Sequence, residues 1–372
     1  MSQSNTLESI RFSPKERNLF FPTVRKRVDQ YFADNKISKT ANTEMVMKTI
    51  ILLSGYILPF VAIVTFRIEG LAGYALWAFI GVCTAGIGMS VMHDANHGAY
   101  SKKQSVNDWI GYSLNLLGGS TFNWKLQHNI LHHTYTNIAT HDEDIKDRAI
   151  LKFSPHGKRK GIQKYQYLYA VVFYGIITLY WVLAKDLVQY IVFKKLGVNK
   201  NSPAENLQLL VRISLTKIIY LAVVIGLPIY LGMSVGFVIW GFLLMHFVAG
   251  IILTLVFQMA HTVEGTSHPV ADENGVIEND WAIHQMNTTV NFSRNNAFLG
   301  WYLGGLNYQV EHHLFPKICH VHYPAIAQIV EQTAKEYGVP YLENKTFGLA
   351  LSSHFRLLRQ LGHLPSLNEA IG

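Results

Sequence analysis

Cysteine is almost absent from this chain, which has two cysteines among 372 residues. Cys83 lies inside an apolar run and Cys319 stands alone, so a disulfide framework is excluded. A reducing compartment fits this composition. The same scarcity excludes an iron–sulfur cluster held by cysteines of this chain.

Charged residues are also scarce, at 15% of the chain, whereas hydrophobic residues make up 49%. A soluble domain of this length would carry about 25% charged residues, so we expect a membrane protein. The net charge is +8, and lysine and arginine gather outside the apolar runs, as is typical of cytoplasmic segments. The basic runs at 25–27 and 158–160 come with no recognition motif, so no nucleic-acid partner is expected.

Histidine, in contrast, is concentrated in three clusters. Within them, spacings of three and four residues place side chains on one face of a helix. Imidazole binds iron, zinc, copper and nickel. Seven such donors exceed the roughly four to six coordination positions that a single ion offers. The sequence therefore predicts a site for two metals. The clusters are His93 and His97; His128, His132 and His133; and Gln309, His312 and His313.

Apolar runs long enough to cross a bilayer predict two helical hairpins. The stretch 107–120 is too short, and basic residues flank 166–184 on both sides, so we expect both to lie at the interface. If 166–184 also crossed the membrane, the second and third clusters would lie on opposite sides of it and could not share a metal centre. The predicted fold is an all-α membrane protein with a cytosolic helical cap that holds the di-metal site. Its four transmembrane helices are expected at about 48–66, 71–92, 216–232 and 234–258.

The clusters resemble the three histidine boxes of the membrane fatty-acid desaturase family. Because its third box opens with Gln309, the chain is more similar to the front-end branch. The resemblance covers nearly the whole chain. It extends through Trp124-Lys125-Leu126-Gln127-His128, Trp281-Ala282-Ile283-His284-Gln285 and Phe315-Pro316-Lys317-Ile318.

This resemblance implies an O2-dependent di-iron fatty acyl desaturase, similar to linoleoyl-CoA desaturases, that introduces a cis double bond into an acyl chain. Its desaturase domain would occupy 48–372, after a basic cytosolic N-terminal segment at 1–47. Within that segment, Pro22 favours the start of an amphipathic helix, which we expect to pack on the cytosolic domain; the alternative is that it lies on anionic lipid.

The resemblance also implies roles for residues near the boxes. His261 would complete a set of eight histidines around two iron ions, and Gln309 would be a metal ligand or a hydrogen-bonding neighbour of one. Trp281, Gln285 and Thr289 recur every four residues and would line a substrate channel or pack a helix. The remaining candidates beside the boxes are Asp94, Asp144, Asn307 and Glu311, of which the carboxylates would orient imidazole N–H groups.

Further partners follow from the resemblance. The substrate would be a fatty acyl chain carried by CoA, acyl carrier protein or a lipid, and the oxidant O2. Electrons would come from an external ferredoxin or cytochrome, since neither an iron–sulfur pattern nor a fused haem domain is visible in the sequence. The protein would be a multi-pass membrane protein with a cytosolic active site, in the plasma membrane if it is bacterial.

Two alternatives remain open. A fatty acyl hydroxylase or ketolase could use the same scaffold, because the boxes alone do not determine the product. A membrane metal transporter is disfavoured, because transport sites lie near the bilayer midplane, whereas these clusters lie at and beyond the ends of the expected spans.

Overall fold

The computed structural model describes residues 7, 10–14 and 18–364, so part of the expected basic N-terminal segment lies outside the described residues. Helices dominate this part of the chain. The α-helices are α1 (Phe20–Asp34), α2 (Thr43–Phe66), α3 (Gly70–Gly86), α4 (Met92–Asn96), α5 (Gln104–Gly111), α6 (Ser113–Leu116), α7 (Thr121–Trp124), α8 (His133–Tyr135), α9 (Gln166–Tyr180), α10 (Asp186–Lys195), α11 (Pro203–Leu221), α12 (Leu227–Tyr230), α13 (Val235–His261), α14 (Trp281–Thr288), α15 (Ala297–Tyr302), α16 (Gln309–Leu314), α17 (Tyr323–Glu336) and α18 (Phe347–His363).

Short segments of other types join these helices. The π-helical segments are η1 (Ile87–Val91), η2 (Lys125–His132), η4 (Trp181–Lys185) and η5 (Ala222–Gly226), and the 3-10 segments are η3 (Gly161–Tyr165) and η6 (His320–His322). Two parallel pairs of two-residue strands join distant parts of the chain. They are β1 (Arg11–Phe12) with β2 (Val276–Ile277), and β3 (Asn291–Phe292) with β4 (Glu343–Asn344).

Five continuous helical stretches in the described chain are long and apolar enough to cross a membrane. They are Thr43–Phe66, Gly70–Asn96, Gly161–Lys195, Pro203–Tyr230 and Val235–His261. The expected helical class is therefore confirmed. Four of the stretches overlap the predicted spans, and the fifth contains 166–184.

Two helices begin well before the apolar runs that predict them. The helix expected from 216 begins at Pro203, because Ser202 and Glu205 form a capping box and proline occupies its first turn. The helix expected from 48 begins at Thr43, where the Asn42 side chain accepts a hydrogen bond from the Met45 amide. Hydropathy locates the apolar part of a helix, whereas capping residues determine where the helix starts.

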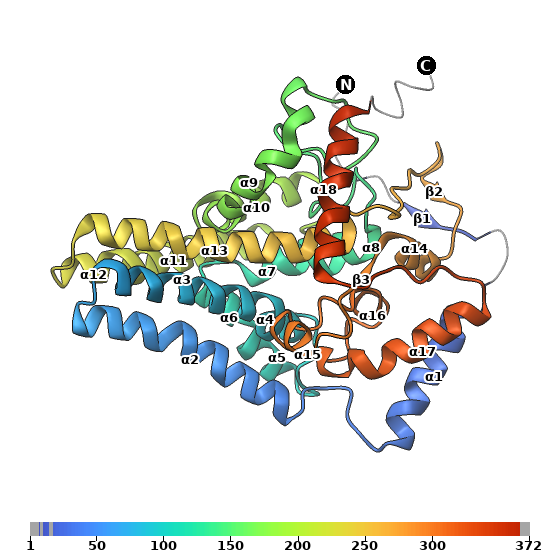
Figure 1. Cartoon of the computed structure of the whole chain (residues 1–372), viewed down its shortest axis with the longest axis horizontal. Helices are drawn as coiled ribbons and strands as arrows, with labels where there is room; N and C mark the ends of the chain where they lie inside the picture. Colours follow the sequence, from blue (N-terminus) through green and yellow to red (C-terminus); the bar gives the residue numbers. More distant parts are fainter. Residues whose placement is uncertain (1–6, 8–9, 15–17, 365–372) are drawn as a thin grey trace.

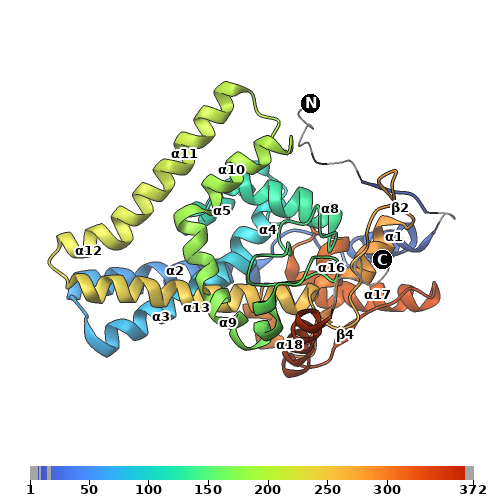
Figure 2. The ribbon, with the colours of Figure 1, turned by 90° about the horizontal axis from the view of Figure 1, so that it is seen from above.

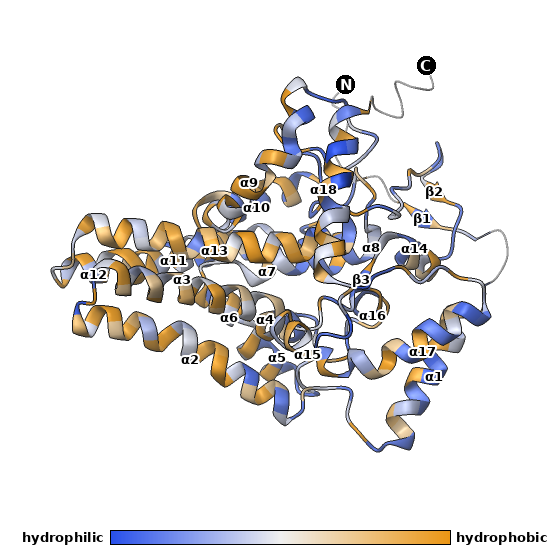
Figure 3. Cartoon of the chain, in the orientation of Figure 1, coloured by the Kyte–Doolittle hydropathy of each residue, from blue (hydrophilic) through white to orange (hydrophobic). Residues whose placement is uncertain are grey.

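Helices α2, α3 and α13 lie side by side, whereas α11 diverges from α13 (Figure 2), and the segments that carry the histidine boxes converge away from the end that holds α12 (Figure 1). Helix α13 packs against both α3 and α9, and α2 packs against α3. Hydrophobic residues dominate the long helices, whereas hydrophilic residues are more frequent at the other end (Figure 3). Seen from above, α9, η4 and α10 run across α13 rather than along it (Figure 2).

A buried ion pair joins α10 to α11. The Lys217 ammonium donates to the Asp186 carboxylate at 2.8 Å, and both side chains are buried. The same ammonium lies 2.9 Å from the Trp181 carbonyl, 2.8 Å from that of Val182 and 3.4 Å from that of Gly118. These acceptors belong to two separate segments of the chain, the stretch Gly161–Lys195 and the loop after α6. Lys217 therefore fixes η4 and the loop after α6 against α11.

Helix α1 packs on the polar end of the molecule, against α17. Helix α1 begins at Phe20, two residues before the expected Pro22, and buries Phe20, Val24, Val28 and Phe32. These side chains share a hydrophobic cluster with residues of α17, and the Arg27 guanidinium pairs with Glu336 at 2.7 Å. The expected packing of this amphipathic helix on the rest of the protein is therefore observed.

A glycine turn places the third box. Gly304 and Gly305 both have positive φ, at 61° and 68°. A Cβ atom at Gly304 would lie 2.4 Å from the Met89 carbonyl oxygen, so only glycine fits this approach. The turn thereby brings the segment before α16 against η1, which precedes the first box.

Candidate metal centre

Four separate segments carry the eight histidines to one place. His93 lies on α4 and His97 directly follows it, His128 and His132 lie on η2, and His133 begins α8. His312 and His313 lie on α16, and His261 is the last residue of α13. All eight side chains are at most 8% exposed. Two of the contributing segments, η1 before the first box and η2, are π-helical, a geometry frequent at functional sites.

The donor nitrogens form two main groups. In the first, atoms of His93, His97, His128 and His312 all lie within 4.8 Å of one another. In the second, the same holds for His132, His261 and His313. His133 forms a further group with His312 and His313, so it lies between the two. The arrangement therefore has two centres, as the count of donors predicts.

Hydrogen bonds fix most of these rings through Nδ1. The Nδ1 atom of His132 lies 2.9 Å from the Asp142 carboxylate, and that of His313 lies 2.7 Å from Oε1 of Gln285. The remaining contacts of this kind join His128 to Asp144 at 3.3 Å, His312 to the Tyr323 hydroxyl at 3.2 Å, and His261 to the Thr288 carbonyl at 3.3 Å. Such partners orient imidazole ligands and fix their tautomer.

Most of the opposite nitrogens have no such partners within the described chain. Within the described chain, the buried Nε2 atoms of His97, His132, His312 and His313 make no hydrogen bond, and neither does either ring nitrogen of His133. The Nε2 atoms of His93 and His128 face each other at 3.2 Å. Buried polar atoms are normally paired, because leaving one unpaired costs about 1–3 kcal/mol. Convergent unpaired nitrogens of this kind suit metal ions.

The electrostatics of the cluster favour neutral rings. Burial, followed by repulsion from neighbouring imidazoles, holds the pKa of His97, His133, His312 and His313 well below the usual 6.5. Burial also lowers the pKa of His128, whereas at His132 the Asp142 carboxylate outweighs burial and raises the pKa. A neutral imidazole keeps the lone pair that a metal ion requires. The donor set therefore fits two transition-metal ions.

The glutamine of the third box lies within the cluster. The amide Nε2 of Gln309 is 2.8 Å from Nε2 of His261, and its side chain is buried. Gln309 is thus positioned beside the second group of donors, where it can contact a bound ion or a ligand of that ion.

Among the acidic residues predicted beside the boxes, only Asp144 contacts a box histidine. Asp94 instead accepts a hydrogen bond from Nδ1 of His320 at 2.8 Å, and Nε2 of His320 lies 2.7 Å from the Lys48 ammonium. Glu311 is bonded by the Asn291 amide and the Tyr341 hydroxyl, both at 2.8 Å. The expectation that Asp94 and Glu311 orient box imidazoles is therefore not met.

Residues of and after α14 support the second and third boxes from outside. The Trp281 indole donates to the His133 carbonyl at 3.2 Å, and the Gln285 amide donates to it at 3.3 Å. Thr289 donates to the Gln285 carbonyl at 2.7 Å. Asn307 is also buried, and within the described chain its side-chain amide makes no hydrogen bond.

Sequence reasoning missed side chains that contact box histidines. Asp142 holds His132 and accepts a hydrogen bond from the Asn137 backbone amide at 3.0 Å, Tyr323 contacts His312, and the Thr136 hydroxyl lies 3.3 Å from Nδ1 of His313. Asp142 stands in the acidic run that follows the second box, but no spacing distinguishes it from Asp144. Tyr323 begins α17, and nothing near it in the sequence indicates a metal site.

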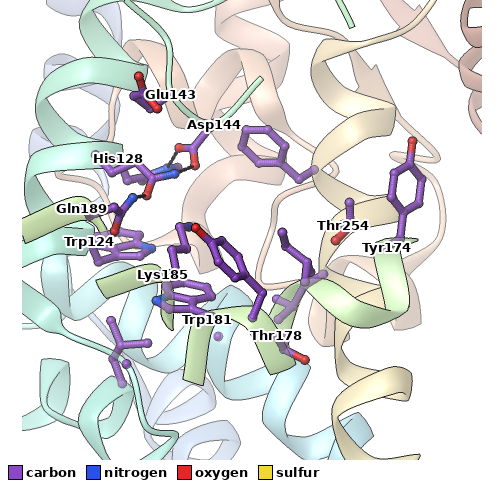
Figure 4. A pocket seen from close by; sticks show the side chains of 18 of the residues that line it. Trp124, His128, Glu143, Asp144, Tyr174, Thr178, Trp181, Lys185, Gln189 and Thr254 are labelled. Carbon is purple, nitrogen blue, oxygen red and sulfur yellow. Dashed lines mark hydrogen bonds and ion pairs between the residues drawn. The ribbon is translucent and has the colours of Figure 1, made fainter. Parts of the chain in front are cut away.

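A cavity of about 410 Å3 leads to the first group of donors. Most of its lining is apolar, and His93 and His128 form part of its wall. Figure 4 shows Trp124, His128 and Asp144 on one side of it and Tyr174 and Thr254 on the other. Trp281, Gln285 and Thr289 are not among the lining residues, so this cavity gives no support to the channel role expected for them.

A chain of hydrogen bonds joins the cavity wall to the cluster. Gln189 of α10 donates to Gln127, Gln127 donates to Asp144, and Asp144 contacts His128 (Figure 4). Gln127, His128, Asp144 and Gln189 all line the cavity. A molecule bound in the cavity would thus lie against residues that hold a candidate metal ligand.

Comparisons with known proteins agree with this site. Residues 69–345 match the family model described as fatty acid desaturase. The chain is 37% identical over 362 residues to the sn-1 linoleoyl-lipid 6-desaturase of Synechocystis sp., a match that covers 96% of this chain and 99% of that protein. It is 34% identical over 359 residues to the acyl-lipid (8-3)-desaturase of Physcomitrium patens, covering 95% of this chain and 74% of the relative.

The chain belongs to the fatty acid desaturase family. It is therefore an oxidoreductase that acts on fatty acids, and the resemblance to the front-end branch is confirmed.

Replacing Asp142 with asparagine should weaken metal binding, because a neutral amide oxygen accepts the His132 N–H more weakly than the charged carboxylate does. Losing such a partner typically costs about 10–100-fold in metal affinity or activity. Metal retained during dialysis against graded chelator measures the change. The matched control is Glu143→Gln, since the Glu143 carboxylate pairs with Lys146 at 2.7 Å. Equal metal retention by both variants would contradict the role of Asp142.

Proposed function

We propose that this protein is an O2-dependent di-iron desaturase that places a cis double bond in a fatty acyl chain carried by a membrane lipid. The observation that carries the proposal is the gathering of eight buried histidines in two groups, the first of which reaches the wall of an apolar cavity through His93 and His128. The relatives described above are named as desaturases of acyl-lipids, which supports a lipid as the carrier of the acyl chain over CoA or acyl carrier protein.

The protein's own residues have separable tasks in this reaction. His93, His97, His128 and His312 would hold one iron, and His132, His261 and His313 the other, with His133 between them. Iron would supply the activation of O2. The cavity would bind the acyl chain beside His93 and His128 and exclude water from the oxidation.

The overall reaction defines what must reach the site. One CH2–CH2 unit and one O2 take up two electrons and two protons and yield one CH=CH unit and two waters. The acyl chain supplies the other two electrons. An external reductant, either a ferredoxin or a cytochrome, is therefore a required partner.

The proposed topology has four membrane spans, with the active site and both termini in the cytosol. Second-box residues before α9 and third-box residues after α13 belong to one cluster, so an even number of spans must separate them. Three of the apolar stretches lie between these boxes. The course of α9, η4 and α10 across α13 supports Gly161–Lys195 as the stretch that stays at the interface (Figure 2).

Cysteines placed at Lys164 and Lys195 should therefore react with a membrane-impermeant maleimide from the same side. Both positions are exposed, and the natural Cys83 and Cys319 are buried, so background labelling should be low. Leu71→Cys, at the start of α3 beside the turn that follows α2, is the control for the opposite side, with Leu71 87% exposed. Labelling of positions 164 and 195 from opposite sides would make Gly161–Lys195 a span.

The main test combines metal content with product analysis. Purified protein should contain close to two iron atoms per chain, and lipids of an expressing host should gain a double bond that mass spectrometry can locate. Retention of an oxygen atom from O2 in the lipid would instead identify the hydroxylase or ketolase alternative. Full activity with a single iron, or with zinc alone, would rule out the di-iron assignment.

Gln309 is proposed to tune the site without being an indispensable donor, because His261, His312 and His313 remain as nitrogen donors when it is replaced. Gln309→His should then keep both irons, and Gln309→Ala should keep most of the iron with lower activity. His312→Ala is the comparison variant, and it should lose iron and activity, since it removes a nitrogen from the first group. Iron content and double-bond formation are measured for all three. Iron loss in Gln309→Ala as complete as in His312→Ala would refute the tuning role.

A further inference from the structure

The active site proposed above needs electrons from outside, yet its histidines are at most 8% exposed. Electron transfer through protein slows steeply with distance, so a reductant must dock where a short path leads inward. The surface near His133 is of particular interest, because His133 lies between the two donor groups.

A continuous set of contacts joins His133 to helix α1. The Trp281 indole N–H donates to the His133 carbonyl at 3.2 Å. On its other side, the Trp281 ring packs edge-on against Phe21 of α1, with ring centroids 5.7 Å apart. Phe21 also contacts Phe315, which follows the third box, at 5.9 Å. Two aromatic rings and one hydrogen bond thus connect the groove described next with a cluster histidine.

Phe21 forms part of a shallow surface groove along α1, together with Pro22, Arg25, Lys26, Asp29 and Gln30. Arg25 and Lys26 are exposed, and within the described chain neither pairs with an acidic side chain. Lys39 neutralises Asp29 at 2.5 Å, and Lys317, two residues after Phe315, is exposed as well. The groove therefore presents uncompensated positive charge.

The helix that carries this groove is held in place before any partner binds. Its apolar face is buried against α17, and the Arg27–Glu336 ion pair lies on the same interface. Helix α1 lies at the opposite end of the molecule from α12 and the turn between α2 and α3 (Figure 1). This position disfavours an anionic membrane surface as the occupant and favours a soluble protein.

We infer that the α1 groove is the docking surface for the electron donor, an acidic redox protein, and that electrons enter through Phe21 and Trp281 to His133. The donor is oxidised by one electron in each of two encounters, and these two electrons enter the overall reaction given above. This inference rests on the proposed function. Complementary charge would steer the donor to the groove and make its association sensitive to salt.

The test uses the full-length protein in lipid nanodiscs, with a photoreduced acidic [2Fe–2S] ferredoxin and, in a second arm, a reduced acidic cytochrome b5-type domain. Arg25→Glu combined with Lys26→Glu should raise the KM for the productive donor about tenfold at low salt and flatten its salt dependence. The matched control reverses the charge of another exposed pair of adjacent basic residues, Lys102→Glu with Lys103→Glu, and should leave the donor KM within about twofold.

A single-turnover arm separates docking from chemistry. Protein reduced by dithionite with a small mediator and then mixed with O2 should form the double bond equally well in the wild type and both charge variants. Equal KM changes in the groove and control variants would overturn the docking surface. So would a groove variant that keeps its donor KM but loses binding to anionic vesicles. A wild type that forms no double bond in this arm contradicts the proposed function, and the docking surface falls with it.

The inward path has its own variant. Trp281→Phe keeps a ring beside Phe21 but removes the N–H donated to the His133 carbonyl. Stopped-flow absorbance should show slower oxidation of the saturating donor, with an unchanged KM. An unchanged limiting rate would overturn the route through Trp281.

Discussion

The structure depends on burying eight imidazoles in neutral form with their lone pairs turned toward common points. Buried polar atoms without partners cost free energy, so such a cluster is stable only when each ring is fixed from behind and the convergent nitrogens receive a ligand. Asp142, Asp144, Gln285, Tyr323 and the Thr288 carbonyl provide the fixing contacts. The convergence of α4, η2, α13 and α16 at one place follows from this requirement.

Much of this arrangement could be predicted from sequence, because it depends on local spacing. An i, i+4 pair such as His93 and His97 shares a helix face in almost any fold. A long apolar run likewise predicts a helix that can cross a membrane. Gln309 and His261 also lie in the cluster, although His261 stands alone in the sequence and is indicated only by its position at the end of the fourth expected span and by the family resemblance. The role of these residues as iron ligands stays a prediction.

The remaining contacts depend on distances across the fold that no spacing encodes. Asp94 adjoins His93 in sequence but bonds His320, which lies 226 positions further along the chain. Tyr323 reaches His312 only because α17 packs beside α16. The expected channel residues Trp281 and Gln285 bond the His133 backbone, since α14 lies against the second box instead of the cavity. Periodicity identifies the face of a helix, whereas tertiary packing selects what that face contacts.

The ion pair between Lys217 and Asp186 has a consequence for how this protein can diverge. One ammonium serves a carboxylate and three backbone carbonyls, all on segments whose residues also line the cavity. Removing one member of a buried pair leaves the other charge uncompensated, which typically costs about 3–5 kcal/mol, whereas replacing both by apolar residues is often tolerated. A substitution at Lys217 or Asp186 alone is therefore expected to lower the stability of the fold. A lineage could remodel this wall of the cavity mainly by exchanging both residues together, so the pair restricts the mutational routes to a cavity of different shape.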